Sequence, residues 1–254
     1  MKTTSSRPLF ISHRGESSKA PENTLAAFHY AMDGNADGME TDIHFTKDGI
    51  VVCSHDCSTK RVFGTEMVVE EHTLAELRQL KAVLHADKYP NETVPTLAEA
   101  LKVLKPGKLF YIEVKHDDPK LVDAMVQEIR AAGVPASQIV VISFRNEAIK
   151  YCKATYPEYK ALWLTCFEKD AATGKHLYDA EHYVHIMKEL GVDGVDCICD
   201  LVFMDEKFYR AMREAHLEIH VWTVDDMEAA RRLVQDGVEG ITSNRALELM
   251  AELC

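Results

Sequence analysis

Two short stretches of the chain carry side chains whose types and spacing suit catalysis. Glu40 and Asp42 stand two positions apart, and so do Glu113 and Lys115. Alternate residues of a β-strand project from the same face, so each pair presents its charged groups together. Both pairs come late in an otherwise apolar stretch. The spacing therefore predicts two strands that deliver carboxylates and a cation to one pocket.

Three more candidate side chains lie beside short apolar runs. His13 ends the run that begins at residue 9, and Arg14 follows it directly. Asp48-Gly49 is typical of the tight turn between the two strands of a hairpin. The returning strand brings His55 back toward the first acidic pair. We therefore expect two histidines and two cations around the carboxylates.

The charge balance of this pocket predicts a metal ion. Three carboxylates against Arg14 and Lys115 leave the pocket negative, so it would repel a phosphate unless a divalent cation joined it. Oxygen ligands favour a hard cation over zinc. We expect Glu40, Asp42 and Glu113 to bind one divalent ion, Mg²⁺ or Ca²⁺, with Mn²⁺ as a further option.

The remaining groups suit reactions at a phosphorus centre. Arg14 and Lys115 would hold phosphate oxygens, one as a fork of donors and the other as a point charge. His13 and His55 would act as general base and general acid, since imidazole titrates near neutrality. Trp222, near the end of another apolar run, would offer a flat surface to a small polyol.

Four further polar residues could have structural roles rather than catalytic ones. His44 shares the strand face of the first acidic pair, and either lines the pocket or serves a structural role. We expect His220 to be packed inside the protein rather than catalytic. Glu22 and Asn23 precede a helical pattern and are expected to pin its loop.

The stretches that must position these residues alternate between β-like runs and longer runs of helical period. The eight candidate strands cover residues 9–12, 38–45, 109–114, 139–143, 160–165, 191–196, 217–224 and 237–243. This alternation predicts an α/β protein, and eight strands favour a closed (β/α)8 barrel over an open doubly wound sheet. In such a barrel the active site lies at the carboxyl ends of the strands.

Length and composition indicate one catalytic domain over residues 1–254, with 46% apolar residues available for its core. Residues from about 57 to 95 interrupt the alternation and are expected to form a small insertion after the second strand unit. Two capping boxes mark helix starts, at Thr73 with Glu76 and at Thr96 with Glu99.

Charge and apolar patterning exclude several functions. A net charge of −12 argues against nucleic acid as a partner. Neither a signal peptide nor a stretch of roughly 20 apolar residues is evident, so we expect a cytoplasmic protein without stable membrane insertion. The seven cysteines lack zinc or redox spacing and are expected to be reduced. The sequence does not indicate an oligomeric state.

Seven ordered motifs resemble the glycerophosphodiester phosphodiesterase family. They are His13-Arg14-Gly15, Pro21-Glu22-Asn23-Thr24, Glu40-x-Asp42, Thr46-Lys47-Asp48-Gly49, His55-Asp56, Glu113-x-Lys115 and Trp222-Thr223-Val224. The resemblance implies a metal-dependent TIM barrel that splits glycerophosphodiesters, such as glycerophosphocholine or glycerophosphoethanolamine, into glycerol 3-phosphate and an alcohol. It implies the same roles for the metal, acid-base and phosphate residues, and it places Trp222 on the glycerol side of the pocket.

The chain departs from the family pattern at three places. The loop between the first two motifs is only residues 16–20, Asp225 stands where the family usually has asparagine, and the last strand ends in Thr-Ser-Asn244 instead of the commoner Thr-Asp. None of these positions is a proposed metal or acid-base residue. We therefore expect that none of them contacts those residues and that they change the contacts to the leaving alcohol.

Two other functions compete with this reading. A lysophospholipase D-type phosphodiesterase would use the same metal core but would need an apolar groove or interfacial helix for an acyl chain. A non-catalytic barrel that binds phosphorylated metabolites or protein partners would be expected to lack a metal carboxylate or a catalytic histidine. Both sets of residues are present.

Overall fold

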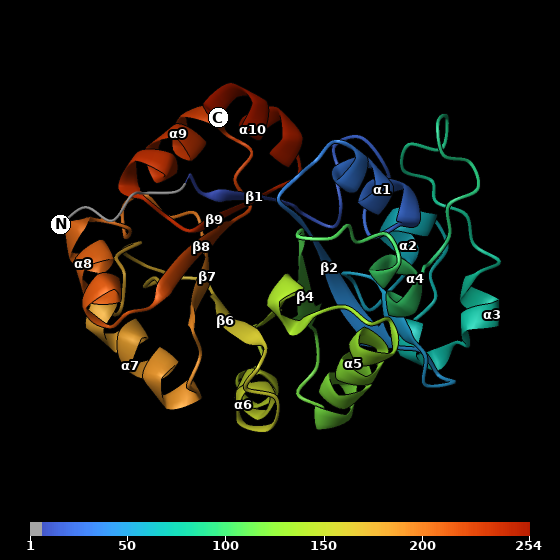
Figure 1. The fold of residues 1–254 in the computed structure, drawn as a ribbon, viewed down its shortest axis with the longest axis horizontal. Helices are drawn as coiled ribbons and strands as arrows, with labels where there is room; N and C mark the ends of the chain where they lie inside the picture. Colours follow the sequence, from blue (N-terminus) through green and yellow to red (C-terminus); the bar gives the residue numbers. More distant parts are fainter. Residues whose placement is uncertain (1–6) are drawn as a thin grey trace.

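Eight parallel strands close into a barrel surrounded by helices (Figure 1). The computed structural model describes residues 7–254; residues 1–6, which the single-domain and signal-peptide predictions include, lie outside this range. The barrel strands are β1 (Leu9–Ser12), β2 (Gly38–Phe45), β4 (Leu109–Val114), β5 (Ile139–Ser143), β6 (Lys160–Thr165), β7 (Gly194–Ile198), β8 (Glu218–Trp222) and β9 (Gly240–Ser243). Each strand pairs with the next in this order, and β9 and β2 both pair with β1. The predicted (β/α)8 barrel is confirmed, and the open-sheet alternative is wrong.

A ninth strand, β3 (Val51–Cys53), extends the sheet from β2. It is antiparallel, with Ile43 opposite Cys53. The turn between the two strands contains Gly49 at a φ of 76°, a conformation that glycine adopts without a Cβ penalty. The predicted hairpin is confirmed.

The helices lie outside the barrel and follow the strands in order (Figure 1). They are α1 (Leu25–Asp33), α4 (Leu97–Leu101), α5 (Pro119–Ala131), α6 (Asn146–Thr155), α7 (Ala180–Leu190), α8 (Glu206–Glu214), α9 (Met227–Asp236) and α10 (Ala246–Leu253), with the short 3-10 helix η2 (Ala136–Gln138) before β5. None of the helices in residues 7–254 is long and apolar enough to cross a membrane.

The segment between β3 and α4 contains α2 (Lys60–Phe63), η1 (Val69–Glu71) and α3 (Leu74–Leu77). It packs around a small apolar cluster that includes Phe63, Val69, Leu77 and Val94. Both capping boxes predicted from sequence are present, at the starts of α3 and α4. The segment thus covers one side of the β2–β3 hairpin with its own buried side chains.

Alternation along the strands divides the buried side chains between two regions. One region fills the barrel interior and includes Ile11, Tyr111, Val140, Ile142 and Leu162. The other lies between the outer face of the strands and the helices. These interior side chains fill the barrel, and the cavity of the barrel opens at the carboxyl ends of the strands.

Two strands begin later than predicted. Gly191 and Gly237 take positive φ values of 71° and 79° and end α7 and α9 as left-handed caps. The predicted strands at 191–196 and 237–243 therefore start only at Gly194 and Gly240, and β7 continues to Ile198. A helix-ending glycine followed by valine had looked like the start of a strand.

Candidate active site

Three buried carboxylates converge at the carboxyl ends of two adjacent strands. Asp42 on β2 lies directly opposite Glu113 on β4 in the parallel register, and Glu40 shares the face of Asp42. The exposed fractions of Glu40, Asp42 and Glu113 are 3%, 1% and 7%. One oxygen from each lies within 4.8 Å of the others. The predicted convergence of the two strand pairs is confirmed.

Burial and mutual repulsion control the protonation of these carboxylates. Burial and the charge of Asp42 raise the pKa of Glu40 well above its usual value and that of Glu113 to about 7. Burial also acts to raise the pKa of Asp42, but Lys115 and Arg14 outweigh it and hold that pKa below its usual range. Carboxylates so close together require a proton or a cation between them.

Lys115 and Arg14 supply the positive charge beside the cluster. The Lys115 Nζ atom lies 2.8 Å from Glu113 Oε1 and 3.2 Å from Asp42 Oδ1. The Arg14 Nε atom lies 3.6 Å from Asp42 Oδ2, and the Arg14 main-chain N–H donates to Glu40 Oε2 at 2.7 Å. Both cations therefore lie beside the predicted metal ligands.

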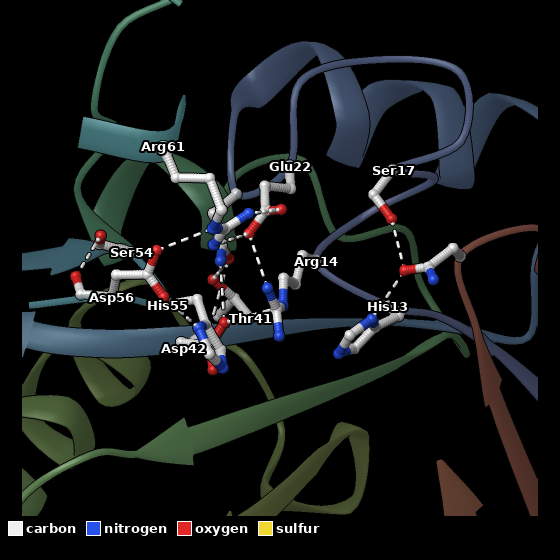
Figure 2. Close-up of polar contacts among 12 residues, drawn as sticks. His13, Arg14, Ser17, Glu22, Thr41, Asp42, Ser54, His55, Asp56 and Arg61 are labelled. Atoms are coloured by element: carbon white, nitrogen blue, oxygen red, sulfur yellow. Dashed lines mark hydrogen bonds and ion pairs between the residues drawn. The ribbon is translucent and has the colours of Figure 1, made fainter. Parts of the chain in front are cut away.

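The loop before α1 is fixed to this cluster (Figure 2). Asn23 donates from Nδ2 to Asp42 Oδ2 at 2.8 Å and accepts from the Thr41 hydroxyl at 2.6 Å. Glu22 accepts from Arg14 at 2.8 Å and also pairs with Arg61. These contacts confirm the prediction that Glu22 and Asn23 pin the loop.

His13 is held by a residue that departs from the family pattern. Its Nδ1 atom lies 2.8 Å from Asn244 Oδ1, and Asn244 in turn donates from Nδ2 to Asp225 Oδ2 at 2.6 Å. Burial and the charge of Arg14 lower the pKa of His13 to about 4. The expectation that none of the departures contacts an acid-base residue is wrong, because β9 closes the barrel beside β1 and brings Asn244 against His13.

His55 follows β3, and its ring nitrogen Nδ1 lies 2.7 Å from Asp56 Oδ1 (Figure 2). Asp56 also accepts from Arg61 Nε at 2.8 Å. The segment after β3 therefore contributes both an anchored histidine and the arginine that pairs with Glu22. Anchoring through Nδ1 leaves Nε2 as the free nitrogen of the ring.

A cavity of about 120 Å³ lies among these groups. One part of its wall is polar and is formed by His13, Arg14, Glu40, His55 and Glu113. The rest is formed by Ile142, Phe144, Leu164, Asp196, Trp222, Thr223 and Thr242. The rings of Trp222 and Phe144 meet edge to face with centroids 5.6 Å apart. Such a pocket can hold a polar reacting group at one side and a small organic group at the other.

Asp42 and Lys115 do not line the cavity but contact Arg14 and Glu113, which do. Neither His44 nor His220 lines it. His44 is absent from the cavity lining, and its Nδ1 atom lies 2.7 Å from Nε2 of His116. His220 is 1% exposed, and its Nδ1 atom lies 3.0 Å from the Tyr111 hydroxyl. These contacts support a structural role for both histidines.

Sequence reasoning missed Asp196, Asn244 and Asp225. Asp196 is the last residue of the predicted strand 191–196, and the structure shows that its buried side chain lines the cavity. Asn244 and Asp225 had been recognised as departures from a motif. Each departure was a signal that its position is unusual, but the contact between the two residues is shown only by the structure.

Comparison with known proteins agrees with this geometry. The model of the glycerophosphoryl diester phosphodiesterase family matches residues 13–248. A glycerophosphodiester phosphodiesterase of Caldanaerobacter subterraneus is 29% identical, with 94% of each chain covered. Another from Bacillus subtilis is 28% identical over 94% of this chain and 84% of the relative.

Solved structures show the same fold. A phosphodiesterase of Oleispira antarctica in complex with the product sn-glycerol 3-phosphate superposes with a TM-score of 0.83 at 25% identity, covering 96% of both chains. A glycerophosphodiester phosphodiesterase from Agrobacterium tumefaciens gives a TM-score of 0.78 at 25% identity, covering 96% of this chain and 99% of the other. The chain belongs to the glycerophosphoryl diester phosphodiesterase family.

Proposed function

We propose that this protein hydrolyses glycerophosphodiesters to glycerol 3-phosphate and an alcohol by metal-dependent acid-base catalysis. The observation that carries the proposal is a single small cavity bordered by buried carboxylates, two histidines and Arg14. The Oleispira antarctica relative, whose structure contains sn-glycerol 3-phosphate as product, supports the assignment of that product.

The acidic cluster fits a divalent metal ion. Its three ligand oxygens lie within 4.8 Å of one another, and oxygen donors suit Mg²⁺, Ca²⁺ or Mn²⁺. When bound, the ion would offset the charge of a phosphate and polarise its phosphorus–oxygen bonds. Glu40, Asp42 and Glu113 would hold it.

The other side chains would bind the phosphate and move protons. Arg14 and Lys115 would offset charge on the phosphate oxygens. With Nδ1 committed to Asn244, His13 presents Nε2 as a base for the attacking oxygen, either of water or of the glycerol 2-hydroxyl; in the second case water would then open the resulting cyclic phosphate. His55, oriented by Asp56, would give a proton to the leaving alkoxide from its own Nε2.

Product analysis tests this proposal. The protein is stripped with a chelator, reloaded separately with Mg²⁺, Ca²⁺ and Mn²⁺, and assayed with glycerophosphocholine and glycerophosphoethanolamine. Release of glycerol 3-phosphate that depends on one of the ions is expected. Cleavage of another diester class without release of glycerol 3-phosphate would contradict the substrate assignment.

His13→Ala separates catalysis from simple binding. The variant should retain metal binding, measured by calorimetry, while turnover falls by roughly 100-fold or more. Unchanged turnover would contradict the acid-base role of His13. Wild-type protein that bound glycerol 3-phosphate but turned over no diester would favour the non-catalytic alternative.

A lysophospholipase D-type activity is a second candidate because apolar side chains are exposed after the barrel strands. Phe144 follows β5, Ile198 ends β7 and Val202 follows it, with exposed fractions of 41%, 36% and 81%. Such residues could accept an acyl chain at the rim. A higher kcat/KM for lysophosphatidylcholine than for glycerophosphocholine would favour this candidate.

A further inference from the structure

Asp196 is a buried carboxyl group with no role in the proposed reaction. It is 1% exposed on β7, and its Oδ1 atom has no hydrogen-bond partner among residues 7–254. Buried polar atoms are nearly always paired, because an unpaired one loses its hydration without compensation. Since Asp196 also lines the cavity, its missing partner is to be sought on a ligand.

Asp196 and the metal ligands lie on different parts of the barrel wall. Strand β7 is three strands along the barrel wall from β4, which carries Glu113. Around Asp196 the cavity wall is largely apolar, with Leu164 and Trp222 on the neighbouring strands β6 and β8. Trp222 donates from Nε1 to the main-chain oxygen of Asp196 at 3.0 Å. The carboxyl group therefore faces the organic part of a bound substrate.

The chemistry of this carboxyl group favours an uncharged partner. Burial, reinforced by the charge of Glu113, raises the pKa of Asp196 to about 8. A protonated carboxyl group both donates and accepts a hydrogen bond, as a hydroxyl group does. An ammonium group would instead seek an ionised carboxylate.

With phosphate at the metal ligands, the hydroxyl group farthest from phosphorus is the terminal hydroxyl of glycerol. We infer that Asp196 binds this terminal hydroxyl and so selects diesters whose glycerol is free of an acyl chain. This inference rests on the proposed function. An ester at that oxygen would remove the donor for the unpaired Oδ1 atom and would add bulk to a cavity of about 120 Å³.

A substrate lacking only that hydroxyl tests the inference. The metal-loaded wild-type enzyme is assayed with glycerophosphocholine and with the phosphocholine diester of propane-1,2-diol, which keeps the hydroxyl next to the phosphoester. We expect kcat/KM to be roughly 10- to 100-fold lower for the propanediol diester. Equal values would overturn the inference without any variant having to fold.

Two substitutions assign the preference to Asp196. Asp196→Leu should reduce the ratio of the two kcat/KM values to within about threefold. Asp196→Asn, whose amide also donates and accepts, should retain most of the ratio. Glu16→Gln is the matched control because Glu16 is equally buried but does not line the cavity; it should leave the ratio unchanged. An unchanged ratio in Asp196→Leu would overturn the inference.

Binding measurements distinguish failure of the inference from failure of the proposed function. Calorimetry compares glycerol 3-phosphate with propane-1,2-diol 1-phosphate on the metal-loaded protein. A wild-type protein that releases no glycerol 3-phosphate disproves the function, whereas equal affinities for the two ligands disprove the role of Asp196. If Asp196→Leu instead altered discrimination between choline and ethyl leaving groups, the carboxyl group would face the leaving alcohol and the inference would be wrong.

Discussion

Asn244 accepts a hydrogen bond from His13 Nδ1 at 2.8 Å, and Asp225 determines which end of the Asn244 amide faces the imidazole. Because Asn244 Nδ2 donates to Asp225 Oδ2, the amide oxygen is directed to His13. An amide oxygen only accepts, so His13 must carry its proton on Nδ1. Asp225, which contacts Asn244 and not the ring itself, therefore determines the tautomer of His13 that has a free Nε2.

Asp225→Asn should lower kcat with little change in KM. The substitution removes the carboxylate that accepts from the Asn244 side chain and main chain, so both amide orientations become accessible and only one supports the correct tautomer. We expect a fall in kcat of roughly 10-fold or more. Asp226→Asn is the control, because Asp226 only caps α9. Equal effects of the two substitutions would contradict this role of Asp225.

Asn244→Asp should move the pH dependence of the reaction. A carboxylate beside Nδ1 stabilises the imidazolium and raises the pKa of His13 from about 4. A base is active when deprotonated, so the acid limb of the kcat/KM profile should shift to higher pH. The double variant Asp225→Asn/Asn244→Asp separates the two carboxylates and should recover activity lost in either single variant. An acid limb that stays in place would argue against His13 as the base.

Prediction from sequence succeeded where local spacing determines geometry. Glu40 and Asp42 share a face because strand residues alternate, and the turn at Gly49 returns the chain toward them. The contact between His13 and Asn244 spans 231 positions and depends on closure of β9 against β1. The count of eight strands favoured a closed barrel, but strand alternation does not predict which side chains meet where β9 closes against β1.

Strand boundaries were a second limit. The Gly-Val pair at Gly191 has the composition of a strand but follows a left-handed helix cap, and nothing local distinguishes the two. The predicted strand already ended at Asp196, and β7 extends to Ile198. An acidic residue at the carboxyl end of a barrel strand was therefore a usable signal for the site, although nothing local showed that its carboxyl group lines the cavity.

Glu113→Gln should increase the stability of the metal-free protein and abolish its stabilisation by metal. Removing one buried carboxylate that lies close to two other carboxyl groups should raise the free energy of unfolding by about 1 kcal/mol at pH 8. Wild type should gain about 2.7 kcal/mol when the ion is present at 100 times its dissociation constant. Thermal unfolding with and without Mn²⁺ measures both effects. Glu252→Gln, on the surface of α10, should behave as wild type; metal stabilisation that persisted in Glu113→Gln would contradict its assignment as a ligand.

Glu16 should make stability fall as pH rises toward neutrality. Burial raises the pKa of its carboxyl group from 4.5 to about 7, so the native state binds the proton more tightly than the unfolded state. Its contribution is complete below about pH 4.5 and is lost as pH rises through about 7. Relative to Glu16→Gln, wild type should lose about 1 to 3 kcal/mol over this range. Urea unfolding at several pH values measures it, with Glu252→Gln on the surface of α10 as control; parallel curves for wild type and Glu16→Gln would refute the prediction.

Two glycines with nearly the same backbone angle should respond very differently to substitution by alanine. Gly15 and Gly49 have φ values of 74° and 76°, so each Cβ costs about 1 to 2 kcal/mol through backbone strain. At Gly49 nothing lies within 4 Å of the added atom, whereas at Gly15 it would lie 2.5 Å from the main chain of Ala27.

Gly15→Ala must therefore also displace α1 or the loop that carries Arg14. Its N–H donates to the Glu40 main-chain oxygen at 3.1 Å, so the displacement also disturbs the acidic cluster. We expect Gly49→Ala to keep its activity, and Gly15→Ala to lose at least about 2 kcal/mol more stability together with most of its turnover. Chemical denaturation and steady-state kinetics on the two variants measure this difference. Equal costs would mean that the first loop can move away from α1 without disturbing the site.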